Sequence, residues 1–278
     1  MHPFKPAHRG IPPRTAQRRY TRLFPGVYID PAAPVTPLVK ARAAWLWADG
    51  ACVLTGISAA AVHGARWLPG EAPAEVAVGR VVRVRGLVAH RDRIHPRDIT
   101  DRLGMRVTSP ARTAFDLARR HEPDTAICHI DALCRATDLA PNALLDLAGA
   151  LRATPGAARL RALAGLVDPG AESPRETVLR LLLLRAGLPR AVTQFVVRDA
   201  RGRFIGRTDL AWPRWRVAIE YEGSHHFTDP EQARRDAERG NRLMRAGWRV
   251  VRVTAPMMQR PDLIIEEVRA ALRAAGGC

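Results

Sequence analysis

Three carboxylates stand at spacings that would let them act together in chemistry. Ten residues lie between Asp209 and Glu220, and Glu222 follows two positions later. Apolar residues alternate with the two glutamates, so a β-strand over 217–222 would place both carboxylates on one face. Pro213 interrupts the preceding segment and would let the strand that carries Asp209 fold back beside this one. We therefore expect the three carboxylates to converge on one surface.

Converging acids favour a bound cation, because carboxylates repel one another unless positive charge neutralises them. An all-oxygen set suits Mg²⁺, or Mn²⁺ in its place, which can activate water and stabilise the leaving oxygen of a phosphodiester. Asp209, Glu220 and Glu222 are thus the expected metal ligands. The alternative is that these acids only solvate an outer sheet face and form ion pairs with Arg207 and Arg216.

The charge balance indicates a polyanionic partner. The 278 residues carry 44 Lys and Arg against 27 Asp and Glu, a formal net charge of +17. Nearly all of the positive charge is arginine, whose planar group suits phosphates, so we expect DNA as the partner. A genome rich in G and C would also raise the arginine content. An RNA-binding role lacks an obvious stacking platform, because Phe, Trp and Tyr make up only 5% of the residues.

Eight arginines are the candidates for contact with nucleic acid: Arg14, Arg18, Arg19, Arg22, Arg207, Arg239, Arg242 and Arg252. The first four alternatively form a basic tail without fixed structure. Arg239 and Arg242 would share one helical face with Asp236, where surface ion pairing is the alternative role.

The sequence contains no stretch of eighteen apolar residues and no apolar signal region at its N-terminus. We therefore expect a cytoplasmic protein that does not enter a membrane. The four cysteines are scattered, so reduced thiols are expected.

Composition and periodicity divide the chain into four parts. Residues 1–35 form a basic segment rich in Pro and Arg, 36–166 a mostly helical α+β domain, 167–172 a linker, and 173–278 a second domain. The elements expected in the first two parts are a strand over 23–29, helices over 38–47 and 57–63, strands over 75–78, 82–90 and 105–107, and helices from Pro110 to about residue 166, interrupted near Pro141 and Pro155.

The residue pattern of 173–278 predicts the element order αβββαβα. Ser173 to Glu176 has the pattern of a capping box at the start of a helix. The expected elements are this helix to residue 185, strands over 192–198, 203–211 and 217–222, a helix to about residue 246, a strand over 248–253 and a helix over 263–272. The expected fold class is therefore α/β (α+β).

The C-terminal order resembles the restriction-endonuclease-like PD-(D/E)XK superfamily, and most closely its Vsr-related members, over about residues 172–273. The matching features are Glu176 on the helix, Asp209 on the second strand, Ile219-Glu220-Tyr-Glu222-Gly-Ser-His-His226, Asp236 to Arg239, and Gly247 to Arg252. The resemblance implies a mixed sheet and a Mg²⁺-dependent endonuclease that hydrolyses DNA phosphodiester bonds in repair, defence or mobile elements.

The resemblance also implies roles for individual residues. Glu222 occupies the position of the lysine that gives the superfamily its name, which leaves the general base open. His226 is the candidate, because a neutral imidazole with a pKa near ~6.5 can accept a proton from water. The alternative for His226 is a loop histidine that only bonds the backbone. Glu176 would reach the metal or its water, or would only cap its helix.

The N-terminal half resembles the AbiEi-type antitoxin family in three segments, 23–28, 55–64 and 107–118. The resemblance implies a winged-helix segment that binds DNA, although its recognition helix would have to fit before Leu23, so a truncated remnant is expected within 1–35. It also implies a cognate toxin protein as a partner, and a neighbouring nucleotidyltransferase reading frame would favour that role.

Two functions follow from these patterns. The first is a Mg²⁺-dependent endonuclease that an AbiEi-like region docks on DNA, and a homodimer would let it cut both strands. The second is an antitoxin or transcriptional regulator whose nuclease-like domain is catalytically silent, which the missing lysine favours.

Overall fold

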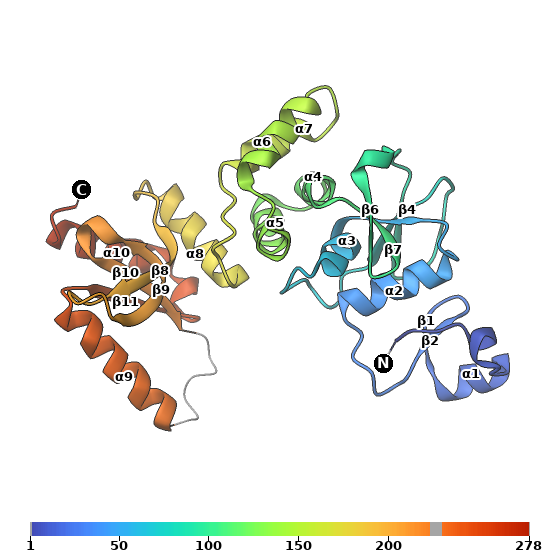
Figure 1. Cartoon of the computed structure of the whole chain (residues 1–278), viewed down its shortest axis with the longest axis horizontal. Helices are drawn as coiled ribbons and strands as arrows, with labels where there is room; N and C mark the ends of the chain where they lie inside the picture. The colour runs from blue at the N-terminus through green and yellow to red at the C-terminus, as the bar shows by residue number, and fades with distance from the viewer. Residues whose placement is uncertain (1, 223–229, 278) are drawn as a thin grey trace. The chain divides into compact units, whose positions relative to one another are not determined.

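The computed structural model describes residues 2–222 and 230–277. The chain divides into two compact units, Met1–Pro169 and Gly170–Cys278, which Figure 1 colours from blue to yellow-green and from yellow to red. The division falls inside the stretch 167–172. Both units mix helices with sheets, so the predicted fold class is confirmed.

Unit 1 begins with short helices and a hairpin: η1 (Pro6–Arg9), α1 (Pro13–Arg19), β1 (Thr21–Phe24) and β2 (Val27–Ile29). The prediction of one strand over 23–29 is wrong, because Pro25 and Gly26 make a turn that separates two antiparallel strands. Gly26 has a φ of 75°, a conformation that glycine adopts without steric cost. Phe4 adds a bridge to Tyr28 on the other side of β2. A helix therefore precedes a hairpin within the first 29 residues.

The main sheet of unit 1 has the strand order β5-β4-β3-β7-β6. Its strands are β3 (Val53–Leu54), β4 (Ala74–Ala77), β5 (Leu87–His90), β6 (Ile99–Arg102) and β7 (Met105–Thr108), with η2 (Pro96–Asp98) before β6. The β3–β7 and β4–β5 pairs are parallel and the other pairs are antiparallel. The sequence predicts β5 too long, and it does not predict β3 or β6, because β3 has only two residues and β6 has one apolar residue among its four.

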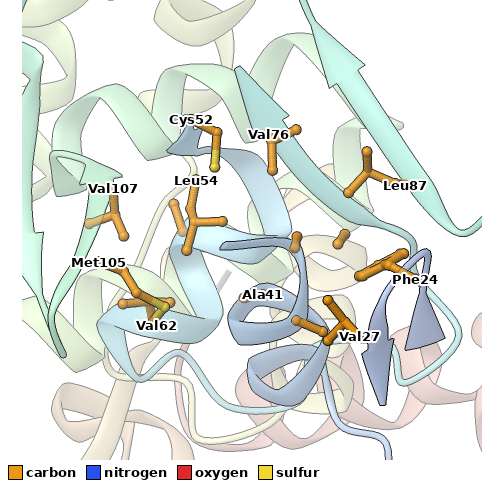
Figure 2. Close-up of a cluster of buried hydrophobic side chains, with 14 residues drawn as sticks. Phe24, Val27, Ala41, Cys52, Leu54, Val62, Val76, Leu87, Met105 and Val107 are labelled. Atoms are coloured by element: carbon orange, nitrogen blue, oxygen red, sulfur yellow. The ribbon is translucent and has the colours of Figure 1, made fainter. Parts of the chain in front are cut away.

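Two alanine-rich helices, α2 (Pro37–Trp47) and α3 (Gly56–His63), pack with this sheet. Figure 2 shows the buried cluster in which Leu54, Val76 and Val107 of the strands meet Ala41 of α2 and Val62 of α3. Small alanine side chains let the helix backbones lie close to the strands. The predicted helices over 38–47 and 57–63 are confirmed.

The rest of unit 1 is helical: α4 (Pro110–Arg120), α5 (Pro123–Thr137), α6 (Pro141–Ala150) and α7 (Ala157–Ala164). The first three helices start with proline, which needs no hydrogen-bond acceptor at that position. Ser109 caps α4, since its Oγ accepts from the amide of Arg112 at 3.3 Å. The expected helical region to about residue 166 is thus confirmed.

Unit 2 has the predicted order αβββαβα: α8 (Pro174–Arg185), β8 (Val192–Arg198), β9 (Phe204–Trp212), β10 (Val217–Glu222), α9 (Pro230–Arg245), β11 (Arg249–Thr254) and α10 (Pro261–Ala274). Short helices η3 (Pro213–Trp215) and η4 (Met257–Gln259) lie between them. The sheet order is β11-β10-β9-β8, in which only β10 and β11 pair in parallel among the described strands. The sheet is mixed, as expected.

The two faces of this sheet carry different helices. Val217 and Ile219 point into a cluster with α8 and α10, whereas Ala218 packs into a cluster with Leu243 of α9. Figure 1 shows α9 and α10 on opposite sides of the sheet. By alternation, Glu220 and Glu222 stand on the α9 face.

Candidate functional site

The carboxylates of unit 2 come together because β9 and β10 pair as an antiparallel hairpin. Ala211 lies opposite Ala218 and Leu210 opposite Ile219. Asp209, the next residue of β9, accepts a hydrogen bond of 2.7 Å from the amide of Tyr221 through its Oδ2. The predicted return of the chain at Pro213 is therefore confirmed, and it brings Asp209 beside Glu220.

Glu176 reaches the same place from the first turn of α8. Its Oε1 accepts from the hydroxyl of Ser173 at 2.8 Å, and its amide donates to Ser173 Oγ at 3.3 Å, so the predicted cap is confirmed. Its Oε2 accepts from the amide of Glu172 at 2.9 Å. Glu176 is therefore a buried capping residue whose carboxylate also faces Asp209, and the two roles are compatible.

Gln194 joins these two acids. Its side-chain Nε2 donates to Oε2 of Glu176 at 2.9 Å and to Oδ1 of Asp209 at 3.4 Å. Its φ is 49°, in the left-handed region that residues with side chains seldom adopt. Gln194 was missed from the sequence, where a polar residue in strand 192–198 gives no sign of its strained backbone or its partners. Strain of this kind is often found at functional positions.

Burial and mutual repulsion favour the neutral forms of these acids. Burial raises the pKa of Asp209, and the nearby charge of Glu220 adds to this, while the amide of Tyr221 opposes it. Burial likewise raises the pKa of Glu176, with a further contribution from the charge of Asp209. A cation placed among these carboxylates would reverse both effects.

The two glutamates of β10 are held by arginines. Arg239 of α9 forms a fork on Glu220, with Nη2 at 3.1 Å from Oε2 and Nη1 bonded to Oε1. Arg252 of β11 places its Nε 3.3 Å from Oε1 of Glu222. The expected ion pairs of the acid cluster therefore form, but with Arg239 and Arg252 instead of Arg207 and Arg216.

The donor set suits a hard cation in composition but is already satisfied by protein groups. Carboxylate and amide oxygens come from Glu176, Gln194, Asp209 and Glu220, the ligand type that Mg²⁺ prefers. Within residues 2–222 and 230–277, no group of three or more His, Cys, Asp or Glu side chains is arranged to hold a metal ion. Binding of Mg²⁺ would therefore require Arg239 to leave Glu220.

The other predicted residues are placed as follows. His226 lies outside the described residues. Arg207 pairs with Glu172, with Nη2 at 2.8 Å from Oε2. Arg242 is exposed and has no ion pair with any described residue. Asp236 lies 3.7 Å from Arg239 through Oδ1 and Nη2, so the expected helical ion pair on α9 forms with Arg239.

The N-terminal arginines lie on the short helix and the hairpin that follows it. Arg14, Arg18 and Arg19 are exposed on α1, and Arg22 is exposed on β1. They belong to a helix and a strand, so the alternative of a basic tail without fixed structure is wrong. A helix with exposed arginines that leads into a hairpin is an arrangement able to contact phosphates.

Unit 1 contains a buried polar network that the sequence did not predict. Its centre is Glu75, which is 6% exposed. Glu75 Oε1 accepts from the amide of Ile57 at 2.9 Å, and Oε2 accepts from Arg120 Nη1 at 3.0 Å and lies 2.8 Å from His90 Nε2. Burial acts to raise the pKa of Glu75, but these bonds and the charge of Arg120 outweigh it, so the pKa is lowered.

A second buried acid, Asp116 of α4, completes the network. Thr55 Oγ1 donates to Asp116 Oδ2 at 2.5 Å. The guanidinium groups of Arg112, Arg119 and Arg120 lie within 3.3 Å of Asp116 Oδ1. Thr55 and Asp116 belong to the motif segments 55–64 and 107–118, so these segments join the start of α3 to α4 through a buried hydrogen bond. In the sequence, this network could have been recognised from Glu75, a single acid inside an otherwise apolar strand.

Two histidines lie at the edge of the network without hydrogen bonds from their Nε2 atoms. The rings of His121 and His129 meet edge to face with centroids 5.3 Å apart. Each Nε2 is buried and has no hydrogen-bond partner among the described residues. Burial, followed by the charge of His121, lowers the pKa of His129 to about 4. His129 is therefore held neutral.

Comparisons with known proteins bear on the first unit. The family described as AbiEi antitoxin C-terminal domain matches residues 43–166. This range contains the network and the motif segments 55–64 and 107–118, so the AbiEi resemblance is confirmed there. In the part of the chain that the structure describes, no helix has the length and apolarity needed to cross a bilayer.

The chain is also similar to two uncharacterized proteins of Mycobacterium tuberculosis, from strains CDC 1551 / Oshkosh and ATCC 25618 / H37Rv. Each is 31% identical over 157 residues, which make up 56% of this chain and 58% of the relative. The chain thus matches little more than half the length of these relatives. No solved structure matches it. Residues 43–166 are therefore similar to the AbiEi antitoxin C-terminal domain.

Proposed function

We propose that this protein is an antitoxin-like regulator in which unit 1 binds a cognate toxin protein and the N-terminal arginines contact DNA. The observation that carries the proposal is the AbiEi antitoxin match over residues 43–166. The buried network of Glu75 and Asp116 supports it, because it gives the matched region a rigid core of its own. The helix and hairpin before this region support the DNA contact, since their arginines are exposed and four occur within nine residues.

Growth rescue tests the toxin part. A nucleotidyltransferase-like toxin, taken from a reading frame next to this gene where one is found, is expressed in a host alone, with the full chain, and with a Gly56→Ala chain whose unit 1 is disturbed. The proposal expects arrest with the toxin alone, rescue by the full chain and weaker rescue by the variant. Failure of the full chain to rescue growth, with both proteins present in the cell, contradicts the proposal.

Binding to the promoter region of its own gene tests the DNA part. Arg14→Gln/Arg18→Gln removes two exposed charges from α1, and Arg83→Gln/Arg85→Gln removes two exposed charges from the loop before β5 as a matched control. We expect the first variant to weaken binding and to reduce the dependence of log K on log salt by about 1 to 2. Equal binding by both variants contradicts a role for α1.

The geometry of unit 2 favours a second function, a metal-dependent endonuclease. The specific observation is that Gln194 links Glu176 to Asp209, and that Asp209 lies beside Glu220 on the adjacent strand. Acids from a helix and two strands thus face one another, in the order that the resemblance to Vsr-related nucleases implies.

In this function Asp209 and Glu220 would hold Mg²⁺, with Glu176 and Glu222 completing its shell or holding water. The ion, when bound, would supply a Lewis acid that lowers the pKa of water. The chain's own part is to hold the carboxylates in place through the Tyr221 amide and the Gln194 side chain. Arg239 is placed to move from Glu220 to a phosphate oxygen, because its planar fork suits both partners. His226 is the proposed proton acceptor.

Cleavage assays test this function. The full chain is incubated with plasmid, duplex and single-stranded DNA and Mg²⁺ or Mn²⁺, beside Asp209→Ala and a control, Glu238→Ala, which removes an exposed acid of α9. The nuclease proposal expects cleavage by the full chain and the control only. Cleavage that survives in Asp209→Ala points to a contaminant and removes the proposal.

A further inference from the structure

A cleft of about 1120 Å³ opens on the α9 side of unit 2, and the carboxylates of the candidate site are not among the residues that line it. Its walls are the turn between β8 and β9, the residue before β10, and the end of α9 with the residues that lead into β11. Six arginines line it, Arg198, Arg201, Arg203, Arg216, Arg242 and Arg245, against one acid, Asp199.

The charge of this cleft exceeds what the composition of unit 2 predicts. From residue 170 onward the chain has 20 arginines and 13 acids, a ratio of about 3 to 2, whereas the cleft has six to one. Drift of the whole sequence towards arginine would raise the number of arginines everywhere and would not remove the acids from one place. The cleft is therefore a local concentration of positive charge.

Most of these guanidinium groups are free to bind an anion. Arg203 pairs with Asp199, its Nε at 2.7 Å from Oδ2. The other five have no carboxylate partner among the described residues, although Arg198 and Arg216 each reach a backbone carbonyl oxygen. All six side chains are exposed. Unpaired arginines gathered around one cleft repel one another, so a polyanion would stabilise this arrangement.

An aromatic ring stands among these charges. Phe204 lines the cleft and is 59% exposed, which is unusual for a large apolar side chain, and Trp248 also lines it with 8% exposure. Arginines that follow a phosphate backbone, combined with an exposed ring on which a base can stack, are the features of sites that bind unpaired nucleic acid. A duplex hides its base faces and would leave the ring without a partner.

We infer that this cleft binds a single strand of nucleic acid, with Arg201, Arg242 and Arg245 on its phosphates and Phe204 stacked on a base. The span across three elements fits several nucleotides and exceeds the needs of a single phosphate ion. Arg242 and Arg245 follow Arg239 at intervals of three on α9, so the strand would lie along the helix that also contacts Glu220. The inference depends neither on toxin binding nor on cleavage.

Fluorescence anisotropy with the full chain tests it, using labelled 20-nucleotide DNA and RNA single strands, the matching duplex, and polyglutamate, all in EDTA so that no metal-dependent reaction contributes. Arg242→Gln/Arg245→Gln is compared with Arg260→Gln/Arg273→Gln, which removes two exposed charges on the α10 side of the sheet. We expect the cleft variant to raise the Kd for single strands about 10-fold or more and to lower the salt slope by about 1 to 2.

Phe204→Ala separates stacking from charge. We expect it to weaken binding of single strands about 5-fold or more, with an unchanged salt slope and no effect on duplex binding. Phe204→Leu, which keeps apolar bulk, should resemble Phe204→Ala if the ring stacks, and melting curves verify the fold of each variant. Three results would each overturn the inference. They are an equal loss of single-strand affinity in both arginine variants, tighter binding of duplex or polyglutamate than of single strands, and a single-strand Kd that Phe204→Ala leaves unchanged.

Discussion

Arg239 and Glu220 are locked in a two-point ion pair across the α9 face of unit 2. Nη2 lies 3.1 Å from Oε2 while Nη1 bonds Oε1, and Glu220 is 8% exposed. A buried carboxylate with both oxygens bonded to one guanidinium group is well satisfied, and loss of either partner leaves a buried charge. The same carboxylate cannot hold Arg239 and a divalent ion in this way at once.

Arg239→Ala is expected to lower the free energy of unfolding by about 2 kcal/mol, because Glu220 would remain buried without its partner. The same change frees Glu220, so calorimetric titration should find tighter Mn²⁺ binding than in the unaltered protein if Glu220 is a ligand. Urea unfolding with and without Mn²⁺ measures both effects, and Arg239→Ala/Glu220→Gln is the control. Equal Mn²⁺ affinity in the single and double variants excludes Glu220 as a ligand.

Asp209→Asn should leave the stability of the fold nearly unchanged at neutral pH. The pKa of Asp209 is raised, so its contribution to stability is present below the unfolded pKa and is lost as the pH rises through the folded value. The neutral amide cannot ionise and can still accept from the Tyr221 amide. We expect the difference in unfolding free energy between variant and parent to shift in favour of the variant as the pH rises from 3 to 7. A shift in the opposite direction contradicts the raised pKa.

Glu75→Gln should destabilise unit 1 at neutral pH by about 2 kcal/mol, since Arg120 would lose one of its two buried carboxylate partners and keep Asp116. The pKa of Glu75 is lowered from 4.5, so its contribution is present above the unfolded pKa and is lost as the pH falls through the folded value. The penalty of the substitution should therefore shrink below about pH 4.5. Chemical unfolding at pH 7 and pH 4 measures it, and a penalty independent of pH contradicts the charged network.

Gly56→Ala tests the same network through packing. A Cβ at Gly56 would lie 2.4 Å from Oε1 and 2.5 Å from Oε2 of Glu75, whose carboxylate is fixed by its hydrogen bonds. Gly64→Ala is the matched control, because Gly64 also has a positive φ but its nearest contact is Ala136 Cβ at 4.0 Å. We expect the first variant to melt several degrees below the second. Equal melting temperatures show that the carboxylate moves without cost.

His129→Leu should reduce the acid sensitivity of unit 1. The pKa of His129 falls from 6.5 to about 4 on folding, so its contribution to stability is present above pH 6.5 and is lost as the pH falls towards the folded value. The shift corresponds to about 3 kcal/mol. Unfolding curves at pH 7 and pH 4.5 measure this loss, which the leucine variant should not show. His121→Leu serves as a comparison, since its ring also lacks an Nε2 partner among the described residues.

The sequence by itself determined the elements of unit 2. Strands 192–198 and 217–222 follow from alternation, and the start of α8 follows from the pair Ser173 and Glu176, because these patterns depend on neighbours in the chain. It also placed Asp209 beside Glu220, since Pro213 between two strands leaves a hairpin as the simple solution. Two of the three AbiEi-like segments, 55–64 and 107–118, likewise lie in the region that matches the family over 43–166.

Only the tertiary structure decided which charges pair. Arg239 and Arg252 hold the glutamates of β10, and Arg120 reaches Glu75 across 45 positions of sequence, because an ion pair depends on distance in space and many arginines compete for few acids. The cleft that gathers six arginines has the same origin. It arises where segments distant in sequence meet, and periodicity along the chain carries no record of that meeting. The strained backbone of Gln194 and the short strands β3 and β6 leave no periodic pattern in the sequence either.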